Sequence, residues 1–104
     1  AVNAGRIYYY TGATWLGYTS ATEAPQKGLL GIAVGTTMSK GFILKGFIRP
    51  NAVASSTAGA PVFGAANASI TSTAPTSGYQ RIMGHAISTS VIYFNPSADY
   101  LDLT

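Results

Sequence analysis

The fold is decided by Leu30-Gly31-Ile32-Ala33-Val34-Gly35-Thr36, a pattern that returns 53 residues later as Met83-Gly84-His85-Ala86-Ile87-Ser88-Thr89. Both copies follow the order large, Gly, large, Ala, large, small, Thr. Successive side chains of a strand point to opposite faces, so this alternation predicts two equivalent β-strands. Their large faces fill a core, and their faces of Gly and Ala let another backbone or sheet approach closely.

The surroundings of the two copies are also alike. A short aromatic strand precedes each copy, at residues 5–9 and 59–63, and a Pro-to-Gly turn lies just before each, at residues 24–28 and 74–78. The repeat predicts an all-β domain over residues 1–104, in which two similar halves form one small β-barrel or β-sandwich.

The rest of the chain has the punctuation of a sheet protein, with short apolar runs between Gly and Pro turns and no helical period. Strands are expected at residues 6–10, 15–19, 29–36, 42–48, 61–63, 69–72, 81–88, 91–94 and 100–103. Residues 51–59 are expected to form a surface loop. Residues 1–27 either add strands to the same domain or form an N-terminal arm that pairs with a neighbouring subunit.

Composition points to a surface that is covered by other molecules. Hydrophobic residues make up 47% of the 104 residues, whereas charged residues make up 9%, against about 25% in an average soluble domain. A small monomer with so little charge has poor solubility, so contact with copies of itself is expected. The net charge of +3 reflects few acids without any basic run, so nucleic acid is not an expected partner. Membrane insertion is not expected either, because no apolar run reaches the length of a span.

The inventory of ionisable side chains argues against catalysis. The chain has one histidine, His85, and three carboxylates, Glu23, Asp99 and Asp102, and it has no cysteine. Nucleophile-elbow, phosphate-loop and metal-ligand spacings are all missing from the sequence. Because His85 takes the place of Ile32 in the repeat, it is expected to be a packed or hydrogen-bonded structural residue. We therefore expect no enzyme, no cofactor and no metal.

Candidate contacts with other subunits come from the aromatic N-terminal region and from the strip of small residues. They are Tyr8, Tyr10, Trp15, Tyr18, Gly31, Ala33, Gly35, Gly84 and Ala86. Two alternatives stay open, namely that a loop of the same chain covers the small strip and that the aromatic rings stack on sugars. Asn67 begins a match to the N-glycosylation sequon. Phe42 and Phe47 are five apart in one expected strand, so they face opposite sides and form no base-stacking platform.

From about residue 28 onward the chain resembles bacteriophage virion structural proteins, in particular small capsid decoration proteins and related fibre modules of tailed phages. The segments that carry the resemblance are residues 29–36, 41–48, 59–63, 70–75, 81–87 and 92–96. It implies a compact β-barrel over residues 28–104, repeated on a virion or along a fibre, with no catalytic residues. Residues 1–27 lie outside the resemblance.

Together these features predict a structural subunit of a virion-like or extracellular fibrillar assembly, which associates with itself or with a capsid or fibre lattice. The alternative function is a carbohydrate-binding or host-recognition module that uses Trp15 and the nearby tyrosines to bind surface glycans.

Overall fold

The computed structural model describes residues 2–49, 53–54, 58–65, 68–71, 73–88 and 91–103. Its elements are β1 (Ile7–Tyr10), β2 (Trp15–Gly17), α1 (Ala24–Lys27), β3 (Leu29–Ala33), the 3-10 turn η1 (Met38–Lys40), β4 (Phe42–Ile43), β5 (Gly46–Ile48), β6 (Val53–Ala54), β7 (Pro61–Gly64), β8 (Ile70–Thr71), β9 (Tyr79–Gln80), β10 (Ile82–Ala86), β11 (Ile92–Phe94) and β12 (Leu101–Asp102). The all-β class is confirmed. The described strands form three open sheets, so the closed-barrel alternative is not observed.

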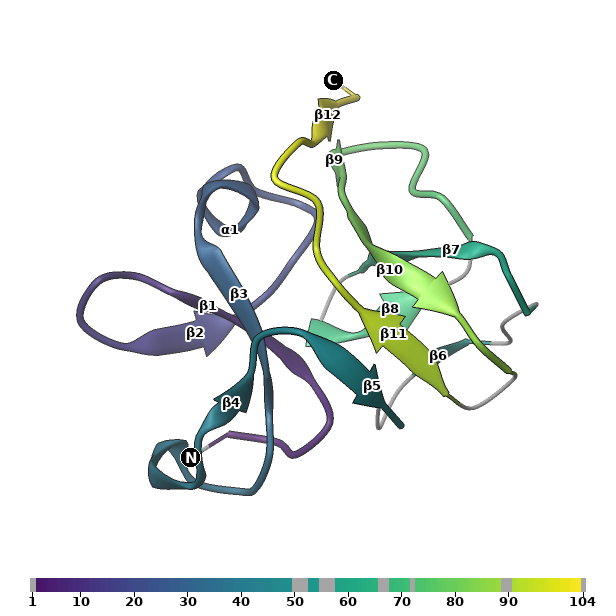
Figure 1. The fold of residues 1–104 in the computed structure, drawn as a ribbon. Coiled ribbons are helices and arrows are strands. Elements are labelled where there is room, and N and C mark those ends of the chain that lie inside the picture. Colours follow the sequence, from purple (N-terminus) through teal and green to yellow (C-terminus); the bar gives the residue numbers. More distant parts are fainter. Residues whose placement is uncertain are drawn as a thin grey trace.

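Two sheets carry the internal repeat (Figure 1). The four-stranded sheet has the order β2-β1-β3-β4, and the six-stranded sheet has the order β5-β11-β10-β7-β8-β6. Within the larger sheet the run β8-β7-β10-β11 repeats the order of the smaller one, and every pairing in both runs is antiparallel. The registers also match, since Tyr8 opposes Gly31 and Val62 opposes Gly84. The expectation of two similar halves is confirmed.

Equivalent backbone hydrogen bonds hold the start of both repeats. The N–H of Gly5 donates to the carbonyl of Ala33 at 2.9 Å, and the N–H of Gly59 donates to the carbonyl of Ala86 at 2.7 Å. Both glycines have positive φ, 78° and 87°, which a residue without Cβ adopts without steric cost. The two turns that lead into β1 and β7 therefore have the same construction.

The segment expected to be one strand over residues 42–48 is divided between the two sheets. β4 pairs with β3 in the four-stranded sheet, and β5 pairs with β11 in the six-stranded sheet. The chain turns between them at Leu44 and Lys45, and Gly46, the first residue of β5, has a φ of 143°. β5 is the outer strand at one end of its sheet.

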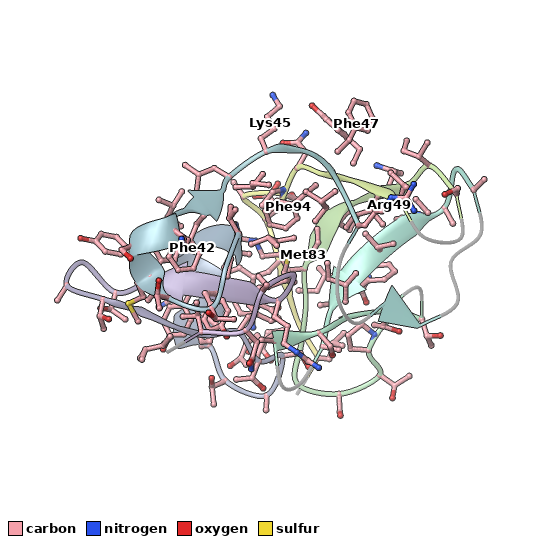
Figure 2. The ribbon with its side chains drawn as sticks, turned by 90° about the horizontal axis from the view of Figure 1, so that it is seen from below. Phe42, Lys45, Phe47, Arg49, Met83 and Phe94 are labelled. Carbon is pink, nitrogen blue, oxygen red and sulfur yellow. The ribbon has the colours of Figure 1, made fainter. Side chains whose placement is uncertain are left out.

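One core joins the two sheets. Its buried members are Ile7, Tyr18, Leu30, Ile32, Ile48, Val62, Ile70, Met83, Ala86, Ile92 and Phe94. In Figure 2, Met83 and Phe94 lie in the interior. A second cluster of Val2, Tyr8 and Ala33 covers the other face of the four-stranded sheet. β1 thus has both faces buried and both edges paired within its own chain. Of the two alternatives for residues 1–27, the structure shows added strands of the same domain.

Several local expectations were wrong. A helical turn, α1, replaces the predicted turn before β3, and β6 lies within the predicted loop 51–59. β3 ends at Ala33 and β10 at Ala86, so Val34 and Ile87, predicted to face the core, are 55% and 50% exposed. These two side chains follow the last ladder residue, where strand alternation no longer applies.

His85 is exposed, which corrects its predicted place in the core. The register of β10 shifts between Ile82 and Gly84, and Gly84 has a φ of 145°. Such a bulge changes which side chains face inward. Met83 and Ala86 consequently both point into the core although they are three residues apart.

Candidate contact surface

The strip of small residues is covered by the chain itself. Gly31 and Ala33 are buried, and a Cβ at Gly31 would lie 2.9 Å from the Cβ of Phe42 and 3.3 Å from the Trp15 ring. Gly84 and Ala86 are buried in the other half. These four predicted subunit contacts are therefore corrected to internal contacts.

Gly35 is the part of the small strip that stays half-buried. A Cβ added there would lie 2.7 Å from Cγ of Lys40, a flexible side chain. The side chain of Lys40, from the same chain, thus occupies the space beside Gly35.

The N-terminal aromatic residues pack mainly on one another. Tyr8 and Tyr18 are buried, so neither can meet another subunit. Half-buried Trp15 stacks on Phe42 with ring centroids 4.0 Å apart and an angle of 15°, and the centroid of the Tyr10 ring lies 5.2 Å from that of Trp15. One face of the Trp15 ring is therefore occupied, which weakens its use as a sugar platform. Tyr10 remains 39% exposed.

Large apolar side chains are exposed on several elements. Those between 38% and 70% exposed are Tyr10, Leu16, Leu29, Val34, Met38, Leu44, Phe47, Ile82, Ile87 and Leu101. Phe47 is the most exposed of them, at 70%. Figure 2 shows Lys45 and Phe47 projecting together from the rim of the molecule.

Phe47 belongs to a row that crosses four strands on the outer face of the six-stranded sheet. Phe47 opposes Tyr93, Tyr93 opposes His85, and His85 opposes Pro61. The rings of Phe47 and Tyr93 are 5.0 Å apart, within the range of favourable aromatic pairs. Sequence reasoning missed this row, and the available signal was the two-residue spacing of Lys45, Phe47 and Arg49 in and beside one short strand.

A cleft of about 480 Å³ runs beside this row, between the two sheets. Its lining is mostly apolar and includes Val34, Ile43 and Phe47, with Arg49 as its cation. Lys45 and Arg49, both exposed, flank Phe47 at two residues on either side. We call Lys45, Phe47 and Arg49 the basic rim.

Desolvation and the nearby charges of Asp102 and Glu23 raise the pKa of Tyr79, and both carboxylates also raise the pKa of Tyr100. Asp99 lines a cavity with Tyr100. We call this region, where β9 and β12 pair near α1, the acidic end. The hydroxyl of Tyr100 donates to Oε2 of Glu23 at 2.8 Å, and that hydrogen bond is the main cause of the raised pKa of Tyr100. Glu23 also pairs with Lys27 at 3.8 Å. In Figure 1, α1, β9 and β12 lie at the top, away from β5.

The acidic end also has a cavity of about 290 Å³. Its lining residues are Gln80, Ile82, Ser97, Asp99, Tyr100 and Leu101. Ile82 and Leu101 are both exposed apolar side chains, so this cavity combines an apolar wall with a carboxylate.

A buried polar cluster of Tyr18, Gln26 and Arg81 holds the acidic end in place. Nε of Arg81 donates to the carbonyl of Ser97 at 2.6 Å, and Nη1 donates to the carbonyl of Gln26 at 2.6 Å. Tyr18 donates to Oε1 of Gln26 at 2.6 Å. Burial lowers the pKa of Arg81 and raises that of Tyr18. These bonds tie α1 to the segment that leads into β12.

Tyr18→Phe should therefore change how stability depends on pH. Because the pKa of Tyr18 is raised above its usual value of 10.0 in the fold, its contribution is present below pH 10 and is lost as the pH rises through the raised value. At neutral pH the free energy of unfolding of the variant should be about 1 kcal/mol lower, because the hydrogen bond from the hydroxyl to Gln26 is missing. Urea unfolding at increasing pH should show this deficit shrinking above pH 10, and a constant deficit would contradict the prediction.

The described residues offer no metal centre and no membrane-spanning helix. They contain no group of three or more His, Cys, Asp or Glu side chains that could hold a metal ion. No helix within them is long and apolar enough to cross a membrane. The sequon residue Asn67 lies outside the described residues.

The fold and its surfaces define a small all-β domain with two similar halves and several exposed large apolar side chains. Comparison with protein-family models, with curated proteins and with solved structures found no match for this chain. Its function is therefore inferred from its residues and their geometry.

Proposed function

We propose that the chain is a structural subunit that associates with copies of itself, as in a virion-like or fibrillar assembly. The observation that carries this proposal is the set of large apolar side chains that are 38% to 70% exposed, in a chain with only 9% charged residues. Exposed apolar side chains that lie against one another are typical of protein contact sites, and Phe47 lies against Tyr93 with ring centroids 5.0 Å apart. The resemblance to phage decoration and fibre proteins agrees with it.

The open ends of the sheets add backbone groups to these surfaces. β2, β4 and β5 are outer strands of their sheets. Outer strands present unpaired N–H and C=O groups, which favour pairing with another chain. The exposed Phe47 lies on β5, one of these strands.

The purified protein should form particles well above the monomer mass of 10.7 kDa. Burial of the exposed apolar side chains drives the association. By mass action, the fraction of assembled protein should rise with protein concentration. Sedimentation velocity combined with negative-stain electron microscopy measures this directly. A monodisperse monomer at high concentration would contradict the proposal and would favour a glycan-binding module.

A further inference from the structure

We propose that copies meet through unlike surfaces, with Phe47 of one copy entering the cavity between Ile82 and Leu101 of the next. The basic rim then faces the acidic end of the neighbour. This inference rests on the proposed self-association and names the surfaces that perform it.

Phe47 has the properties of the inserted side chain. It is 70% exposed on β5, an outer strand, although it is a large apolar residue. Its contact with Tyr93, at a ring separation of 5.0 Å, holds the ring in position before association. A side chain that is already held loses less conformational freedom on binding, so more of its burial contributes to affinity.

The cavity at the acidic end has the properties of the receiving site. Its volume of about 290 Å³ is large enough for a phenyl ring, and its walls include Ile82, Tyr100 and Leu101. Ile82 and Leu101 are 38% and 57% exposed. Filling the cavity removes apolar surface of both side chains from water, which stabilises the contact. An aromatic side chain in a pocket of this kind is a common centre of a protein contact.

Charge favours contact between unlike surfaces. Lys45 and Arg49 flank Phe47, and Asp99 lines the cavity. Positive and negative surfaces of this kind select each other during association.

Pairing of two β5 strands with each other is disfavoured. Lys45 and Arg49 lie just before and just after β5, so an antiparallel pairing extended from Phe47 would bring Lys45 of one copy opposite Arg49 of the other. Like charges directly opposite each other destabilise a strand pair. β5 therefore carries its own protection against self-pairing, which leaves the acidic end as its complementary surface.

The first test removes the inserted ring. Phe47→Ser should raise the apparent dissociation constant of the assembly by at least about thirtyfold, the effect of losing a central apolar contact. Leu16→Ser is the matched control, because Leu16 is 48% exposed on β2 of the other sheet. It should leave the sedimentation profile unchanged, and thermal unfolding should show that both variants are folded.

The second test reverses the charges. The double variant Lys45→Glu with Arg49→Glu and the double variant Asp99→Lys with Asp102→Lys should each sediment as monomers at low salt. An equimolar mixture of the two should assemble again, because each variant then presents the charge that the other lacks. Assembly of both variants at the wild-type concentration would overturn the inference while leaving the proposed self-association intact. A monomeric wild type would overturn both.

Discussion

Gly84→Ala is expected to leave little folded protein, because the new methyl group has no room. Gly84 has a φ of 145°, and a Cβ at this position would meet the carbonyl oxygen of Tyr93 on the adjacent strand β11. The methyl carbon is fixed to the backbone of β10 and the oxygen belongs to the backbone of β11, so relief requires separation of the two strands. Backbone strain costs about 1–3 kcal/mol, and the overlap should take the total beyond about 4–5 kcal/mol, against a typical domain stability of about 5–15 kcal/mol.

Gly46→Ala is the matched control for this prediction. Gly46 has nearly the same φ, 143°, but an added Cβ would meet nothing within 4 Å. This variant should lose only the strain contribution of about 1–3 kcal/mol. Urea unfolding followed by circular dichroism measures the free energy of unfolding of both variants. Equal losses would contradict the prediction, because they would mean that β10 and β11 accommodate the methyl group without added cost.

Deletion of residues 1–10 should unfold the domain as a whole. β1 lies between β2 and β3, and its Ile7 is 0% exposed in the core shared by the two sheets. Tyr8 of the same strand fills the second cluster and accepts a hydrogen bond from the N–H of Asn3 at 2.6 Å. Removal would therefore leave one edge of β3 unpaired and take one side chain from each of the two core clusters. Far-UV circular dichroism should lose its β signal and its cooperative melting.

A folded but non-assembling deletion variant would instead mean that residues 1–10 act as an arm for a neighbour. Point variants make the same distinction without removing a strand. Ile7→Ala should cost about 2–5 kcal/mol, as expected for a fully buried aliphatic side chain. Leu16→Ala on the outer strand β2 should stay within about 0.5 kcal/mol, because it changes an exposed position.

The two halves of the domain could be predicted from the sequence because strand alternation and turn glycines are local properties. Leu30 and Ile32 face the core as the spacing predicts. Gly5 and Gly59 mark equivalent turns, and the pairing of β1 with β3 and of β7 with β10 follows the predicted repeat.

The contact surface could be predicted less well, because burial depends on residues distant in sequence. Trp15 and Phe42 cover Gly31, and only the paired sheet places them there. Of the nine predicted subunit contacts, Tyr10 is the one large side chain that the fold leaves well exposed. The sequence predicts one continuous strand over residues 42–48, whereas the exposure of Phe47 arises from the turn that places β5 in the other sheet.

The sequence by itself therefore determined the all-β class, the repeat and the scarcity of charge. Only the tertiary structure decided that the bulge at Gly84 exposes His85, that the small strip is covered internally, and that Glu23 and Asp102 lie near the same tyrosine, Tyr100. The physical reason is that side-chain alternation specifies which residues share a strand face, whereas burial of that face depends on which distant segments pack against it.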